Sequence, residues 1–128
     1  MKRFFVLATA LFLGMTVMAQ AKTDDIVKFA VETHDFGKIK QGTPVTYSFE
    51  IFNISDKPIV IENSWASCGC TTPEKIVDPI MPGKSAKLKV DYNAAAIGAF
   101  NKDVHIKIAG VDQPRTVKIM GEVVAASN

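Results

Sequence analysis

The sequence predicts an all-β protein, a sandwich of two packed sheets, and three observations support that class. Apolar and polar residues alternate through most of the chain after residue 25. Side chains of a strand point to opposite faces in turn, so each alternating run buries one face and exposes the other. Glycine and proline separate the runs, which are short. Six or seven short strands in roughly 100 residues indicate two antiparallel sheets packed face to face.

Six runs carry the alternation, and turn-forming residues lie between them. The expected strands are 27–33, 45–51, 59–61, 86–92, 104–108 and 117–123. The expected turns are at 36–37, 42–44, 55–58, 81–84, 98 and 112–114, where glycine supplies positive φ or proline fixes φ at about −65°. A helical turn is expected at most within 93–100. The expected core includes Phe29, Phe36, Phe49, Ile51, Leu88, Ile106 and Ile119.

The first 21 residues have a different composition from the rest of the chain. Lys2 and Arg3 precede an uncharged, almost wholly apolar run that ends at Ala19, and a small-x-small tripeptide then ends at Ala21. These are the three parts of a secretory signal peptide. The apolar run is shorter than the roughly 20 residues that span a bilayer. We therefore expect a bacterial protein exported to the periplasm or secreted, with cleavage after Ala21 or Ala19.

The expected organisation is a single domain behind this signal. It comprises the signal peptide at 1–21, a short lead at 22–25, an immunoglobulin-like β-sandwich at 26–124 and a tail at 125–128. Cleavage removes two of fifteen basic residues and none of the thirteen acidic ones, so the mature chain is formally neutral. A neutral chain lacks the basic footprint that nucleic-acid binding needs. No integral membrane segment is expected after cleavage.

The segment Cys68-Gly69-Cys70-Thr71 is the chemically distinctive part of the mature chain, and Trp65 precedes it. Residues i and i+2 of an extended strand are about 6.6 Å apart, whereas a disulfide needs Cβ atoms about 3.8 Å apart. The chain must turn for the cysteines to bond, and Gly69 is expected to permit that turn. The bond would close a three-residue loop and contribute only about 1.6 kcal/mol. It should therefore be easier to reduce than a structural disulfide.

Three interpretations of the cysteine pair remain open. The leading one is structural, with two thiols or a tight disulfide shaping a loop, and it requires no cofactor. The second is a redox pair, although the usual redox signature separates its cysteines by two residues at a helix start, and Pro73 follows closely here. The third is a Cu(I) site assisted by Met81 or Met120. A structural zinc site would need four ligands, and no usual spacing supplies them.

The remaining polar candidates favour solvated surfaces over a catalytic site. His34 is expected in a turn and His105 on an exposed strand face. Neither forms a recognisable nucleophile–base motif with Cys68, so no catalytic residues are expected. A face that meets an anionic glycan or an acidic partner is conceivable at Lys102, His105, Lys107, Arg115 and Lys118. Asp103 and Glu122 lie among these residues, which favours an ordinary mixed-charge face.

Several motifs occur together in a recognisable order. They are His34-Asp-Phe-Gly-Lys-Ile39, Phe49-Glu-Ile-Phe-Asn53, Lys57-Pro-Ile-Val-Ile61, Ser67-Cys-Gly-Cys-Thr-Thr-Pro73, Ile80-Met-Pro-Gly83 and Gly98-x-Phe100. The chain resembles exported bacterial domains of unknown function that carry a CGC-Thr motif. These are similar to the immunoglobulin-like domains of major sperm protein and of Hydin-type (ASH-like) ciliary proteins. The resemblance covers about 26–124. It implies a seven-stranded sandwich and no established enzyme activity, and it marks Cys68, Gly69, Cys70 and Thr71 as motif residues.

The leading functional hypothesis is a non-enzymatic interaction or structural module outside the cytoplasm. Its partner would be a protein or a cell-envelope component, recruited through a strand edge or the end loops. The alternative is a thiol-dependent protein, either redox-active or handling Cu(I), that uses Cys68 and Cys70.

The export hypothesis predicts a mature protein of defined mass. Expression in a bacterium should yield an exported chain that begins at Lys22, or at Gln20 if cleavage follows Ala19. Intact-mass measurement without reductant identifies the cut site, and alkylation before and after reduction counts the blocked thiols. A full-length chain retained with the membranes would contradict the hypothesis.

Overall fold

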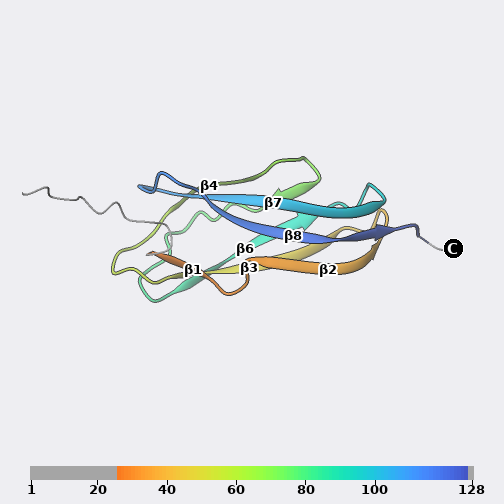
Figure 1. Ribbon diagram of the computed structural model, residues 1–128. Coiled ribbons are helices and arrows are strands. Elements are labelled where there is room, and N and C mark those ends of the chain that lie inside the picture. The colour runs from red at the N-terminus through yellow and green to blue at the C-terminus, as the bar shows by residue number, and fades with distance from the viewer. Residues whose placement is uncertain (1–25, 127–128) are drawn as a thin grey trace, which may run out of the picture.

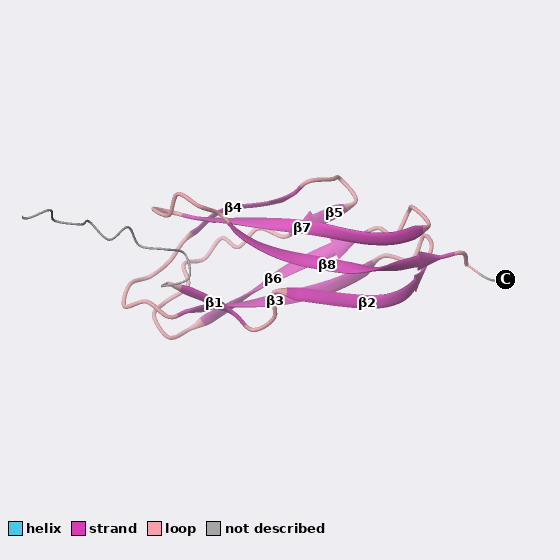
Figure 2. Ribbon diagram, viewed as in Figure 1, coloured by secondary structure: helices cyan, strands magenta, loops and turns pink. Residues whose placement is uncertain are grey.

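The computed structural model describes residues 26–126 and has eight strands in two four-stranded sheets (Figure 1). The predicted signal peptide, the lead at 22–25 and the last two residues of the tail lie outside the described residues. The strands are β1 (Val27–Phe29), β2 (Thr33–Lys40), β3 (Val45–Asn53), β4 (Ile61–Ala66), β5 (Thr71–Pro73), β6 (Ser85–Tyr92), β7 (Gly98–Ile108) and β8 (Arg115–Val124). Figure 2 shows strands and loops over the described range, where no helix suited to crossing a membrane occurs.

The two sheets confirm the predicted β-sandwich. One sheet has the order β1-β3-β6-β5 and the other the order β2-β8-β7-β4. All pairs are antiparallel except one, because β2 lies parallel to β8. The prediction of two purely antiparallel sheets was therefore wrong at this pair. Alternation along a strand reports which face is buried, and it carries no information on the direction of the neighbouring strand.

The first predicted strand, 27–33, is divided between the two sheets. Ala30 still donates its backbone N–H to Glu50 of β3, at 3.2 Å. Two residues later, Glu32 accepts a hydrogen bond from the N–H of Lys118 in β8, at 2.8 Å. The chain thus leaves one sheet and joins the other between Ala30 and Glu32. This switch produces eight strands where the resemblance implied seven.

The turn expected at Phe36 and Gly37 is instead a bulge within β2. The pairing of β2 with β8 shifts register between Asp35 and Lys38, and Gly37 adopts a φ of +69°. The Gly37 N–H donates to the Asp35 carboxylate at 2.8 Å. An Asp-x-Gly segment is favoured in bulges for the same reason as in turns, since both need positive φ and a local side-chain acceptor. His34 consequently lies in β2, against expectation, and stacks on Tyr47 of β3 at 3.7 Å between ring centroids.

The core lies between the two sheets and is almost entirely apolar. Phe49, Ile51 and Leu88 from one sheet and Ile106 and Ile119 from the other are fully buried. Each such side chain contributes about 1.5–3 kcal/mol on burial. The predicted core residues are confirmed except for Phe36, which is half-buried because β2 is an edge strand.

Asn53 at the end of β3 is, with Thr71, one of two buried polar residues in the described part of the chain, and 1% of its surface is exposed. Its Nδ2 donates to the carbonyls of Lys57 and Ile80, at 2.7 and 2.8 Å. Its Oδ1 accepts from the backbone N–H and the hydroxyl of Ser55, at 2.9 and 2.7 Å. The amide therefore has all its donors and acceptors matched, and it joins the β3–β4 loop to the segment before β6.

Replacement of this amide tests how strongly the loop connections depend on it. Asn53→Leu keeps the number of side-chain heavy atoms, but it replaces the amide with two bulkier methyl groups and removes four hydrogen bonds. The N–H of Ser55 loses its acceptor, whereas the carbonyls of Lys57 and Ile80 each keep one other donor. We therefore expect a loss of about 2–4 kcal/mol in the free energy of unfolding. Urea denaturation measures the change. Asn101→Leu, on the exposed face of β7, is the matched control and should change stability by less than about 0.5 kcal/mol. Equal losses in both variants would refute the role assigned to Asn53.

Candidate functional site

The motif segment lies where the chain passes from one sheet to the other. Cys68, Gly69 and Cys70 belong to the connection between β4, an edge strand of one sheet, and β5, an edge strand of the other. In Figure 2 this connection runs along the upper rim of the sandwich. The loop is held to β6 because the N–H of Asn93 donates to the carbonyl of Cys70 at 3.0 Å.

Cys68 and Cys70 form a disulfide in the structure. Their Cα atoms are 5.4 Å apart, closer than two alternate residues of an extended strand. The N–H of Thr71 donates to the carbonyl of Cys68 at 3.4 Å and closes the turn. Gly69 has no positive φ, and a Cβ at this position would meet nothing within 4 Å. The expectation that the turn needs glycine at position 69 was therefore wrong.

The two sulfurs have different surroundings on the protein side. Both cysteines are half-buried, but Cys70 packs against the apolar core. Thr71, with 3% of its surface exposed, pairs with Tyr92 of β6 and starts β5. Its hydroxyl oxygen is 3.8 Å from the Sγ of each cysteine. One buried hydroxyl thus contacts both sulfur atoms.

Trp65 lies in β4 rather than in the motif loop. It pairs with His105 of β7, and the two ring centroids are 5.4 Å apart. Its side chain is 38% exposed on the outer face of the sheet. His105 is half-buried beneath it, and its Nδ1 is 2.9 Å from the hydroxyl of Thr116. Both residues therefore belong to the outer face of the β4–β7–β8 sheet.

The structure separates the other residues considered for a metal site. Thr71 pairs with Tyr92 at one end of β6, whereas Met81 precedes the other end, about 23 Å away along the strand. Met120 lies in β8, two strands from β4, in register with Asn101 and Asp35. Within residues 26–126, no three His, Cys, Asp or Glu side chains are grouped as metal ligands. The disulfide itself leaves neither cysteine as a thiolate.

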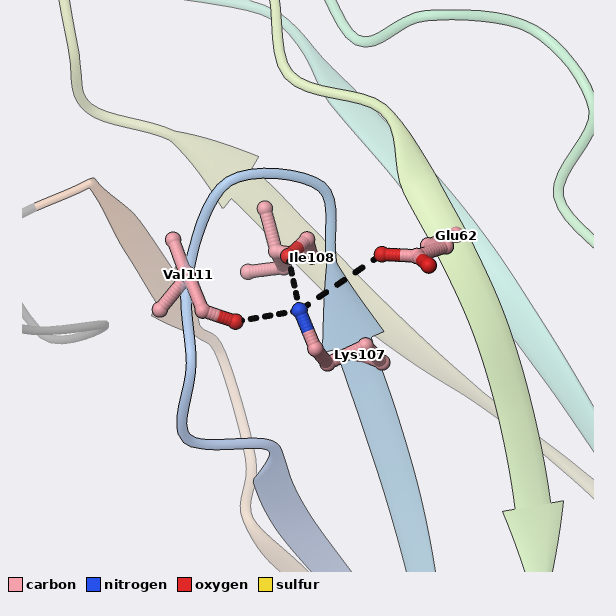
Figure 3. A network of polar contacts seen from close by, with 4 residues as sticks. All are labelled: Glu62, Lys107, Ile108 and Val111. Carbon is pink, nitrogen blue, oxygen red and sulfur yellow. Dashed lines mark hydrogen bonds and ion pairs between the residues drawn. The ribbon is translucent and has the colours of Figure 1, made fainter.

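The basic residues expected on one face are mostly paired with acidic or carbonyl groups. Figure 3 shows the Nζ of Lys107 between Glu62, at 3.5 Å, and the carbonyls of Ile108 and Val111 in the β7–β8 turn. Lys118 lies 3.7 Å from Asp103. Arg115 pairs with Glu32 and lies over the ring of Phe29, a core residue. It is in phase with buried Val117 along β8, so it lies on the inner side of the strand and not, as expected, on the face of Lys118. The pairing of the basic residues favours the mixed-charge interpretation of the face over an anion-binding one.

Comparison with solved structures shows the fold. The fold is that of the ASH, PapD-like and major sperm protein domains, all immunoglobulin-like β-sandwiches. The human CEP192 ASH/PapD-like domain 7 is similar over 90% of this chain and 97% of its own length, with a TM-score of 0.64 and 9% identity. The chain belongs to the family described as "Protein of unknown function (DUF1573)", whose model matches residues 27–123. The predicted family resemblance is thereby confirmed.

Two bacterial proteins share the fold as part of a longer chain. A protein of unknown function from Porphyromonas gingivalis W83 has a TM-score of 0.64 and 17% identity over 76% of this chain. The Vibrio cholerae VesB protease has a TM-score of 0.62 and 16% identity over 79% of this chain. The chain spans 46% of the first protein and 33% of the second. Comparison with curated proteins returned no significant match.

Gly121 in β8 is a structurally important glycine that the sequence analysis missed. A Cβ there would lie 2.8 Å from the carbonyl oxygen of Gly37 and 2.9 Å from the ring of Phe100. The β2 bulge and the Phe100 ring therefore both occupy the space of a side chain at position 121. The signal in the sequence is the glycine that interrupts the alternating run 117–123.

Gly121 and Gly69 should differ in how far substitution by alanine lowers stability. We expect Gly121→Ala to lower the free energy of unfolding by about 1–3 kcal/mol, because a backbone oxygen and a packed ring must move. Gly69→Ala should change it by less than about 0.5 kcal/mol despite its place in the motif. Urea denaturation of both variants, with the disulfide intact, checks the prediction. A larger loss at position 69 than at position 121 would contradict the structure.

Proposed function

We propose that this protein is an exported, non-enzymatic binding module that holds an extended segment of a partner protein along the free edge of β4. The coarser part of this proposal, a binding or structural module, is supported by the ASH and PapD-like fold. The Cys68–Cys70 disulfide supports export, since disulfides persist in oxidising compartments. The observation that carries the proposal is the contrast between β4 and the other three edge strands.

The other edges are short or protected against pairing. β1 and β5 have three residues each, and Pro73 ends β5. β2 has eight residues, but it contains the bulge at Gly37 and the charged side chains of Lys38 and Lys40. Short strands, bulges and edge lysines all hinder the addition of another strand. These three edges are therefore poor templates for a partner.

β4 is six residues long and contains no lysine and no proline. Its pairing with β7 has one irregularity, between Ile61 and Asn63, near the charged Glu62, and the register is then regular from Asn63 to Ala66. In the described part of the chain β4 pairs with β7 on one side, and backbone groups on its other side face no strand. The N–H of Ser64 is the exception to free availability, since it donates to the side chain of Asn63 at 3.0 Å. Added strands bind through such edge backbone groups, and pockets beside the edge select their side chains.

A hollow beside β4 provides such a pocket. It has a volume of about 260 Å³ and is lined by 61–64 of β4 and by 75–77 of the segment after β5. Val77 in its wall is 83% exposed, and Ile61 contributes an apolar floor. Ser64 bonds the carbonyl of Glu74 at 3.2 Å, which fixes the two walls relative to each other. An extended peptide with an apolar side chain directed into this hollow fits the arrangement.

Both histidines support a non-enzymatic module, since each is engaged away from the cysteines. The ring of His34 lies between Phe36 and Tyr47, and that of His105 contacts Trp65 and Thr116. Among these partners, the one hydroxyl group beside a histidine that could act as a nucleophile is that of Thr116, which lies on the solvated face next to His105.

Position-specific photo-crosslinking in the producing bacterium tests the β4 edge. A photoreactive residue at Asn63 should give one discrete adduct, whereas the same residue at Lys38 on the β2 edge should give none. Val77→Asp should reduce the Asn63 adduct by about tenfold or more, because it places a charge against an apolar side chain. The adduct is then digested to locate the crosslinked partner segment.

The double variant Cys68→Ser/Cys70→Ser is the control for a thiol-dependent function. Capture at Asn63 should persist in this variant if the β4 edge binds the partner. Equal crosslinking at Asn63 and Lys38, or capture that Val77→Asp leaves unchanged, would refute the proposal. An adduct between two copies of this chain would also overturn it, because the occupant would then be a second copy.

A further inference from the structure

The Cys68–Cys70 disulfide and the Thr71 hydroxyl form a chemical group that strand binding does not use. We propose that this disulfide is exchange-active: it oxidises a dithiol substrate, and Thr71 stabilises the cysteine thiolate that leaves. The inference rests on the β4–β5 loop and β5, so it is independent of the proposed function of the β4 edge.

The position of the disulfide shows that the fold does not depend on it. The bond joins residues two apart in sequence, so it restrains the unfolded chain very little. Both sheets are held together by the apolar core, to which residues distant in sequence contribute. The turn has its own backbone hydrogen bonds, from Thr71 to Cys68 and from Asn93 to Cys70. Opening the bond should therefore leave the sandwich folded, as a reversible redox group requires.

The two cysteines differ in what they pack against. Both are half-buried, but Cys70 packs against the core, whereas Cys68 lies in the loop outside it. A thiolate nucleophile attacks a disulfide sulfur that it can reach from solvent. The geometry assigns Cys68 as the sulfur that is attacked and Cys70 as the leaving group.

Thr71 is placed to assist the leaving group. Its backbone is fixed by pairing with Tyr92 and by the hydrogen bond to Cys68, so the hydroxyl has a defined position. The oxygen is 3.8 Å from either sulfur and is shielded from water. A hydroxyl that donates to a sulfur anion gives a charge-assisted hydrogen bond, which is stronger than a neutral one. Such a bond favours cleavage because the charge appears only when the disulfide opens.

The reaction balances as a thiol–disulfide exchange. One thiolate of the substrate attacks the Sγ of Cys68, the S–S bond breaks, and its electron pair leaves on the Sγ of Cys70. The substrate's second thiolate then attacks its own sulfur in the mixed disulfide and releases Cys68 as a thiolate. The substrate ends as a disulfide and this protein as a dithiol, with two electrons and two protons transferred.

Reduction of the folded protein by dithiothreitol, and separately by glutathione, tests the proposal. Samples are quenched with iodoacetamide and the blocked thiols are counted by intact mass. The wild-type disulfide should open without denaturant, while the domain is still folded. Thr71→Val should slow opening by about tenfold, the cost of one hydrogen bond to a charged group. Thr72→Val, at the exposed neighbouring position, should react within about twofold of wild type.

A second pair of variants separates the hydroxyl from packing. Thr71→Ser and Thr71→Ala both lose the methyl group, and they differ in the hydroxyl alone. The serine variant should react faster than the alanine variant, again by about tenfold. Cys70→Ser leaves Cys68 as the single thiol, and it should form a mixed disulfide with oxidised glutathione faster than Cys68→Ser does.

Three outcomes would overturn the inference. A disulfide that stays closed under excess dithiothreitol until the domain unfolds would be structural. Thr71→Val could react at the wild-type rate, with serine and alanine equal at this position, and Thr71 would then have no part. Equal or faster reaction of the lone Cys70 would reverse the assignment of the attacked sulfur. Partner capture at Asn63 is measured separately, so failure of the disulfide-exchange proposal can be distinguished from failure of the β4-edge proposal.

Discussion

The packing of one sheet on the other is the constraint on which the rest of the structure depends. No disulfide joins the two sheets in the described part of the chain, because the Cys68–Cys70 bond closes a single loop. Phe49 and Leu88 must therefore meet Ile106 and Ile119 closely enough for burial to hold the domain together. The loops at both ends are then positioned by the sheets, including the connection that carries the cysteines.

The sequence was sufficient to predict this packing because alternation reports burial directly. It identified β3, β6 and most of β8, together with the core residues Phe49, Ile51, Leu88 and Ile119. Of β7 it identified the last five residues, and the expected turn at Gly98 is the start of that strand. It was insufficient for β2, where Asp35-Phe-Gly37 suits a bulge as well as a turn. The parallel β2–β8 pair was equally hidden, since the partner of an edge strand depends on where the chain crosses between sheets. Three-residue strands such as β5 are too short to show any period.

The candidate site was predicted in composition but not in arrangement. The CGC-Thr motif predicted that Cys68 and Cys70 carry the chemistry. It did not predict the contact of Thr71 with both sulfurs, because that contact depends on the pairing of β5 with β6. Gly69 was predicted to permit the turn between the cysteines, although the turn does not require a glycine there. Gly121 was not predicted to matter, although the backbone oxygen of Gly37 and the ring of Phe100 both approach it closely. The sequence motif thus located the disulfide, whereas tertiary contacts identified Thr71 and Gly121 as the residues that support the site and the fold.

The parallel pairing of β2 with β8 has a consequence for the order in which the domain assembles. β2 begins at Thr33, and its partner Lys118 comes 85 residues later in the chain. A chain that emerges from a ribosome or a translocation pore with its N-terminus first must keep β2 unpaired until β8 has appeared. Contacts so distant in sequence form late and slow folding. The second sheet, in which β8 lies between β2 and β7, therefore cannot be completed on a partly emerged chain. The domain stays incompletely folded until its last strand has emerged.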